Sequence, residues 1–130
     1  MNFLRIKETC LYVTDLEKAR MFYEKLLGLT VINYLPSKHL FLRAGDSVLL
    51  LFNPEDSKRK SSPPPHFAVG PQHFAFEVAD EDYDDALDKI RSAGVEIIDE
   101  VDWKSGKKSF YFNGPAGDVL EVVPDKGVWD

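Results

Sequence analysis

The two halves of the sequence repeat the same order of patterns. A strand-like run over residues 5–13 leads into a helical pattern that ends at Gly28, and a second run over residues 72–79 leads into one that ends at Gly94. The two glycines are 66 positions apart, since 94 − 28 = 66. In both helical patterns apolar residues recur every three and four positions, as a helix with one buried face requires. The sequence therefore predicts two copies of one folding unit.

Three short β-rich segments follow each helical pattern, and Ala-Gly-Asp introduces the last segment of each set, at residues 44–46 and 116–118. Short apolar segments bounded by turn residues are typical of strands. We therefore predict an α+β fold of two βαβββ modules in one chain. The predicted strands that follow the helices cover residues 30–35, 39–44, 47–53, 95–102, 107–113 and 118–124.

The stretch between the two repeats has a different composition. It contains the basic and polar run Lys58–Ser62 and then three consecutive prolines, so we expect no regular structure there. We interpret residues 54–70 as a linker between module one, about residues 4–53, and module two, residues 71–125. Neither module alone is large enough to bury much apolar surface. We therefore expect residues 1–130 to form a single domain whose two sheets share one core.

The charge and cysteine content of the chain exclude several classes of protein. Lys and Arg number 16 and Asp and Glu number 22, so the net charge is 16 − 22 = −6, whereas binding to nucleic-acid phosphates needs a surplus of positive charge. The single cysteine, Cys10, excludes an internal disulfide framework. The longest aliphatic run, residues 48–52, is too short to cross a membrane. We expect a cytoplasmic protein without nucleic-acid or membrane partners.

The alternation of side chains along three predicted strands puts one histidine and two glutamates on equivalent faces. Apolar residues at alternate positions face the helices, which leaves Glu8, His73 and Glu121 on the opposite faces. A carboxylate flanked by apolar residues is costly to bury unless a partner neutralises it. One imidazole and two carboxylates suit Zn²⁺, Mn²⁺, Ni²⁺ or Fe²⁺. The alternative is that the three side chains face solvent and bind nothing.

Three segments of the chain resemble a known family. They read ETCLYVTDLEKARMFYEKLLG from Glu8, GPQHFAFEVAD from Gly70 and FYFNGPAGDVLE from Phe110. They are similar to the two module openings and the closing strands of the vicinal oxygen chelate superfamily, which includes glyoxalase I, bleomycin-resistance proteins, fosfomycin-modifying transferases and extradiol dioxygenases. The resemblance implies two βαβββ modules whose curved mixed sheets enclose a cavity, often with a bound metal and often in a homodimer.

The resemblance also implies a ligand set for a divalent metal ion. His73 matches the histidine ligand of the second module, and Glu121 matches the glutamate ligand of the last strand. Glu8 stands at a first-strand position that usually holds histidine or glutamine, so the chain departs from the family pattern there. The position of a fourth ligand falls at Leu49 or Leu50, neither of which coordinates a metal. We therefore expect three protein ligands at most.

Two functions of different classes are implied by the resemblance. The first is an enzyme of the lyase, isomerase or transferase type, whose metal acts as a Lewis acid on two neighbouring oxygens of a small substrate. Dioxygenase chemistry is less favoured, because iron sites that activate O₂ typically have two histidines and one carboxylate. The second function is that of a metal-free protein that sequesters a small molecule, as bleomycin-resistance proteins do.

Three residues are candidates for catalytic roles in the enzyme. Glu121 is a candidate because it would act as a ligand of the metal. Glu77 is a candidate base because it shares a strand face with His73. Tyr12 is a candidate phenol donor to a bound oxyanion. The alternatives are a surface position for Glu77 and a core or rim position for Tyr12.

The linker carries a further hypothesis. Its prolines, charges and serines predict a mobile arm over residues 54–69, with Phe67 near its apolar end. We expect Phe67 to fold over the cavity mouth when a ligand binds, since such lids exclude water. The alternative is a plain surface linker, and His66 is assigned to the loop without a function.

Overall fold

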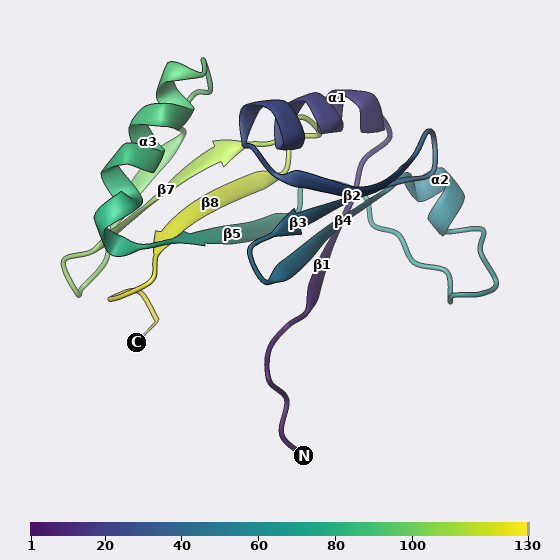
Figure 1. Cartoon of the computed structure of the whole chain (residues 1–130), viewed down its shortest axis with the longest axis horizontal. Helices are drawn as coiled ribbons and strands as arrows, with labels where there is room; N and C mark the ends of the chain where they lie inside the picture. Colours follow the sequence, from purple (N-terminus) through teal and green to yellow (C-terminus); the bar gives the residue numbers. More distant parts are fainter. Residues whose placement is uncertain (130) are drawn as a thin grey trace. The chain divides into compact units, whose positions relative to one another are not determined.

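The computed structural model describes residues 1–129, and the chain divides into two compact units, Met1–Gly70 and the part that begins at Pro71. Each unit contains one four-stranded sheet (Figure 1). Within the described residues, no helix is both long enough and apolar enough to cross a membrane.

The first unit has one strand, one helical segment and three further strands, in that order. β1 (Glu8–Tyr12) runs parallel to β4 (Ser47–Phe52). β4 pairs antiparallel with β3 (His39–Ala44), which pairs antiparallel with β2 (Thr30–Leu35), so the sheet order is β1-β4-β3-β2. The strands after the helix begin at the residues that the sequence predicts.

The helical segment of this unit begins with α1 (Leu16–Arg20) and continues as a π-helical stretch, η1 (Met21–Leu26). Asp15 caps its start, because the Asp15 carboxylate accepts a hydrogen bond from the Lys18 backbone N–H at 3.0 Å. Gly28 follows its end with a φ of +78°, a backbone conformation that glycine adopts without steric cost.

Cross-strand register identifies the side of the first sheet that faces the helix. Tyr34 on β2 lies against the Arg20 guanidinium, 5.0 Å from the ring centre, and Tyr34 pairs with Leu40. Leu40 pairs with Leu51, and Leu51 pairs with Leu11. These leucines are buried and form the centre of the core of this unit. The helix-facing side is therefore the apolar side, as the periodicity predicts.

The expectation of no regular structure after β4 is wrong at its start. Residues Pro54–Ser57 form a short helix, α2. The Asn53 side chain caps α2 by accepting a hydrogen bond from the Glu55 N–H at 3.0 Å. Glu55 also forms ion pairs with Lys58 at 2.9 Å and Arg59 at 3.4 Å. Proline is favourable in the first turn of a helix, and charges three and four residues apart stabilise it, so residues read as breakers here begin a helix.

The second unit repeats the same topology. β5 (His73–Val78) runs parallel to β8 (Val119–Pro124). β8 pairs antiparallel with β7 (Lys108–Asn113), which pairs with β6 (Asp99–Asp102), so the order is β5-β8-β7-β6. β6 begins four residues later than predicted, because the N–H of Val95 bonds back to the helix carbonyl of Ile90 at 3.3 Å.

One helix covers one face of the second sheet. A 3₁₀ turn, η2 (Asp80–Asp82), leads into α3 (Tyr83–Ser92), which runs beside the strands (Figure 1). The ring of Tyr83 meets the fully buried Phe110 edge-on, with 5.5 Å between ring centroids, so Phe110 marks the helix-facing side. Phe112 and Leu120 are buried with it. The α+β fold of two βαβββ modules is confirmed.

Candidate functional site

His73 and Glu121 lie together on the face of the second sheet that is turned away from α3. His73 pairs with Val119 across the β5–β8 ladder, so Glu121 is two residues farther along the neighbouring strand. The His73 Nε2 atom lies 3.2 Å from the Glu121 Oε2 atom. The His73 side chain is 51% exposed, whereas that of Glu121 is only 9% exposed. The sheet therefore presents an accessible imidazole beside a nearly buried carboxylate.

The orientation of the His73 ring is fixed by its other nitrogen. Nδ1 lies 2.7 Å from the carbonyl oxygen of Val119, which can only accept a hydrogen bond, so Nδ1 carries a proton. In a neutral imidazole Nε2 then holds a lone pair, and this lone pair faces the Glu121 carboxylate. Two acceptors at 3.2 Å need a proton or a cation between them. A backbone carbonyl that fixes the histidine tautomer is also the usual support of a metal-bound histidine, so the pair fits a divalent cation.

Tyr111 completes a polar group around Glu121. It pairs with Glu121 across the β7–β8 ladder, and its ring stacks near that of His73, with 6.1 Å between centroids and 25° between planes. Burial raises the pKa of the Tyr111 phenol, a hydrogen bond with Ser109 lowers it, and one with Glu121 raises it. The net pKa is raised, so Tyr111 keeps its proton at neutral pH. The predicted site does not include Ser109, although its alternation with Phe110 assigns it to the face of Glu121.

Glu8 lies in the first unit, at the exposed start of β1, on the face turned away from α1. Its charge reaches Cys10, two residues along the same face: burial raises the pKa of the Cys10 thiol and the carboxylate of Glu8 raises it further. Cys10 is therefore a poor thiolate and behaves as a small, partly buried apolar residue. Among the described residues no group of three or more His, Cys, Asp or Glu side chains forms a metal-binding cluster. The metal role of Glu8 stays a prediction.

Tyr12 lies in an aromatic cluster on that same face of the first sheet. Its hydroxyl lies 2.7 Å from Nδ1 of His66, and the His66 ring meets Phe52 edge-on, with 4.6 Å between centroids. Burial raises the pKa of Tyr12. His66 comes from the segment that joins the modules, and no local pattern in the sequence marks this contact. The cluster, hereafter the aromatic cluster, consists of Tyr12, His39, Phe41, Phe52 and His66.

His39 is the second histidine of the aromatic cluster. Its ring stacks on Phe41 with 4.0 Å between centroids and 7° between planes, and its Nε2 lies 2.6 Å from Oδ1 of Asn33. Burial lowers the pKa of His39, and the positive charge of Lys60 lowers it further. The lowered pKa favours the neutral form of the His39 ring.

Glu77 and Phe67 are the remaining predicted residues, and both are exposed. Glu77 is exposed and pairs with Val123, so it lies on the same face as His73. It is two residues beyond Ala75, the β5 residue that pairs with Glu121. Phe67 is 57% exposed, and its neighbour His66 makes the contact with the sheet. The roles of Glu77 as a base and of residues 54–69 as a lid stay predictions.

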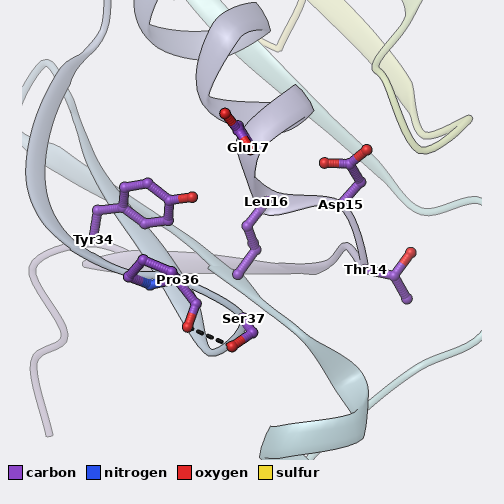
Figure 2. A pocket seen from close by; sticks show the side chains of 7 residues that line it. All are labelled: Thr14, Asp15, Leu16, Glu17, Tyr34, Pro36 and Ser37. Carbon is purple, nitrogen blue, oxygen red and sulfur yellow. Dashed lines mark hydrogen bonds between the residues drawn. The ribbon is translucent and has the colours of Figure 1, made fainter.

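A separate hollow of about 390 Å³ lies at the start of α1 in the first unit. Figure 2 shows Tyr34 on one side and Asp15 and Thr14 on the other, with the Ser37 hydroxyl donating to the carbonyl of Pro36 at 2.6 Å. None of the predicted site residues lines this hollow. Its lining consists of Thr14, Asp15, Leu16, Glu17, Tyr34, Pro36 and Ser37.

Comparison with known proteins gives concordant matches. Residues 5–122 match the family model described as the Glyoxalase/Bleomycin resistance protein/Dioxygenase superfamily. The chain is 36% identical over 115 residues to the glutathione transferase FosA of Serratia marcescens, covering 86% of this chain and 74% of that protein. It is 32% identical to a crystal structure of lactoylglutathione lyase from Agrobacterium tumefaciens, with a TM-score of 0.92 and 96% of each chain covered. A glyoxalase family protein from Enterococcus faecalis is 28% identical, with a TM-score of 0.68 and coverage of 95% of this chain and 99% of that one.

Proposed function

Because the chain belongs to the Glyoxalase/Bleomycin resistance protein/Dioxygenase superfamily, we propose that it is a metal-dependent enzyme of the lyase, isomerase or transferase type acting on a small molecule. One observation carries the metal dependence. Nδ1 of His73 is committed to the Val119 carbonyl, so the lone pair of Nε2 points at the Glu121 carboxylate 3.2 Å away. A divalent ion satisfies both groups at once.

His73, Glu121 and Glu8 would hold the metal. Glu8 is included because it matches the first-strand ligand position of the family. The fourth ligand position falls at Leu49 or Leu50, which cannot coordinate a metal, so three protein ligands remain. A metal bound there supplies Lewis-acid polarisation of substrate oxygens. Two carboxylates and one imidazole make a hard donor set, which favours Mn²⁺ or Zn²⁺ over an O₂-activating iron centre.

The residues around the ligands prepare the site for this chemistry. The near burial of Glu121 keeps water from its carboxylate, and the protonated phenol of Tyr111 faces that carboxylate as a hydrogen-bond donor. Donors that are fixed before substrate arrives cost no reorganisation during a reaction. The exposed edge of His73 leaves the imidazole accessible from solvent.

The substrate class that we propose is a glutathione-linked small molecule. Two similar proteins are a glutathione transferase and a lactoylglutathione lyase, and both exceed 30% identity across most of this chain. Glutathione in a transfer or lyase reaction is therefore the first substrate to test. A change in the rate of glutathione consumption with a panel of electrophiles would distinguish the transferase from the lyase type.

We also propose that the enzyme works as a homodimer. Phe3, Leu4 and Ile6 precede β1 and are 83%, 91% and 80% exposed. Apolar side chains gathered in one exposed arm gain free energy when a second chain covers them. Sedimentation equilibrium would measure the mass, which we expect to be twice that of the 14.8 kDa chain.

A metal-free binding protein is the second candidate function. The specific observation that favours it is the same 3.2 Å contact, because a protonated His73 would pair with Glu121 directly. The aromatic cluster would then supply apolar surface to a sequestered compound.

Metal content separates these two functions. Protein purified without chelators or a histidine tag should contain close to one divalent ion per chain, or accept one Mn²⁺ or Zn²⁺ in isothermal titration. His73→Ala and Glu121→Ala should each reduce the affinity at least about 100-fold, whereas Glu77→Ala, a matched carboxylate deletion on the same strand face, should leave it unchanged. Wild-type protein that binds neither ion would favour the sequestering protein, and full affinity in Glu121→Ala would contradict the ligand assignment.

A further inference from the structure

A chain of polar side chains leads from the β6–β7 turn to Glu121. The indole Nε1 of Trp103 donates to Oγ of Ser109 at 3.1 Å, and Ser109 is fully buried. Ser109 and Tyr111 are two residues apart on β7 and therefore share one face, and Tyr111 pairs with Glu121 on β8. Side chains paired directly across antiparallel strands lie about 5 Å apart at their Cβ atoms. The four side chains thus form a continuous path along one face of the second sheet.

The chemistry of these groups allows only one direction of hydrogen bonding along the path. An indole N–H can only donate, so Ser109 accepts a hydrogen bond from Trp103. The hydroxyl of Ser109 can therefore still donate one hydrogen bond of its own. An ionised carboxylate can only accept, so the phenol of Tyr111 gives its proton to Glu121. The Tyr111 oxygen is left as an acceptor for Ser109. Every proton along the path therefore points toward Glu121.

We infer that Trp103 and Ser109 are positioning residues, which act through Tyr111 to hold the Glu121 carboxylate in the orientation that it needs beside His73. This inference rests on the proposed function, because it assigns Glu121 to the metal. Tyr111 hydrogen-bonds to the Glu121 carboxylate, whose Oε2 atom lies 3.2 Å from Nε2 of His73. Outer partners of this kind typically change metal affinity by about 10- to 100-fold when they are removed.

The turn that carries Trp103 is itself firmly anchored. The backbone N–H of Trp103 bonds to the carbonyl of Lys107 at 2.8 Å, and Lys107 Nζ lies 2.6 Å from the Asp80 carboxylate. The hydroxyl of Ser105 donates to the carbonyl of Gly127, which ties the turn to the C-terminal segment. The first donor of the path is therefore held in place from both sides.

The first experiment measures Mn²⁺ affinity by isothermal titration in wild-type protein and four variants. Ser109→Ala removes the middle of the path, and we expect the affinity to fall about 10-fold. Ser109→Thr restores a hydroxyl and should recover most of that loss. Trp103→Phe keeps a ring but lacks the N–H, and we expect a smaller loss, of about threefold. Trp129→Phe is the matched control and should bind Mn²⁺ as wild-type protein does, because its ring lies near Trp103 without a place on the path.

The second experiment reads the path directly through the indole N–H signals in ¹H–¹⁵N spectra. The chain has two tryptophans, and Trp129→Phe assigns their signals. Addition of Zn²⁺, which is diamagnetic, should shift the Trp103 indole signal in wild-type protein and leave it unshifted in Tyr111→Phe. The Trp129 signal should move in neither protein.

The outcomes distinguish this inference from the proposed function. Tight Mn²⁺ binding that is unchanged in Ser109→Ala would overturn the inference and leave the proposed function standing. If wild-type protein binds neither Mn²⁺ nor Zn²⁺, the proposed function fails, and the metal-free spectra decide the inference. In that case Tyr111→Phe should still shift the Trp103 indole signal, while Glu77→Gln should not, and an unmoved Trp103 signal in Tyr111→Phe would overturn the path itself.

Discussion

The two sheets share one topology but carry different chemistry on the faces turned away from their helices. In the second sheet that face holds His73, Glu121 and Tyr111, whose polar atoms point at one another. In the first sheet the corresponding face holds the aromatic cluster, where even the histidine at position 39 is stacked as a neutral ring. The duplicated scaffold thus carries stacked rings on this face in one copy and a group of polar side chains in the other. Fold and function are separable within a single chain.

The largest effect on this comparison should come from Phe52→Ala. Phe52 is only 8% exposed and contacts Phe41 and His66 edge-on. Removal of a buried phenylalanine ring leaves a cavity and costs about 3 kcal/mol of unfolding free energy. Phe67→Ala, at a 57% exposed position, is the control and should change stability by less than about 0.5 kcal/mol. Urea denaturation measures both, and equal effects would show that the aromatic cluster is not a packing unit.

A smaller effect is expected from Glu8→His, which moves the donor set toward imidazole. We expect the variant to retain a metal and to shift its preference from Mn²⁺ toward Zn²⁺ by about tenfold, because imidazole is a softer donor than carboxylate. Competition between the two ions in one titration measures the shift. An unchanged preference would place Glu8 outside the metal site and leave the chemistry to the second unit alone.

His66→Ala should have an effect of about 1 kcal/mol on stability, the usual worth of a single hydrogen bond. It removes the partner of the Tyr12 hydroxyl and the edge contact with Phe52. The linking segment should then loosen, so trypsin should cleave after Lys58 to Lys60 faster than in wild-type protein. His66→Phe keeps the ring and isolates the hydrogen bond. Identical cleavage in all three proteins would indicate that His66 does not fasten the segment.

The smallest expected effect is a pH dependence that comes from His39. Its pKa in the folded protein lies below the ordinary value of about 6.5, so between these two values the unfolded chain binds more protons than the folded one. The neutral His39 ring therefore contributes its full stabilisation when the pH is above the ordinary pKa. The free energy of unfolding falls as the pH drops through about 6.5. Replacing His39 with phenylalanine should flatten this slope between pH 7 and pH 5 in urea titrations. An unchanged slope would mean that the acid sensitivity arises elsewhere.

Much of the fold could be predicted from the sequence because the repeat is visible in the local spacing of apolar residues and turn residues. The starts of β2, β3 and β4 were predictable from alternation and turn residues, and Gly28 marked the end of a helix. Strand parity also assigns His73 and Glu121 to one face, as the structure confirms. These features depend on residues close in sequence or on a period of two.

Other features depend on contacts that no local pattern records. His66 follows three prolines and reads as loop, yet its ring lies on Phe52 and Tyr12. The helix α2 differs from the sequence prediction because proline and charge, which typically break regular structure, both stabilise the first turn of a helix. Likewise, the hydrogen bond from Trp103 to Ser109 joins a turn to a buried strand position and becomes visible only in three dimensions.

The central proposal is that the second sheet supplies one imidazole and one carboxylate, those of His73 and Glu121, to a metal ion. X-ray absorption at the zinc edge of Zn²⁺-loaded protein tests it most directly, because imidazole scattering is distinct and Zn–S distances, at about 2.3 Å, exceed Zn–N and Zn–O distances. We expect a single imidazole among nitrogen and oxygen ligands, no sulfur, and loss of the imidazole signal in His73→Ala. Two imidazoles, a sulfur ligand from Cys10, or an imidazole signal that survives in His73→Ala would contradict it.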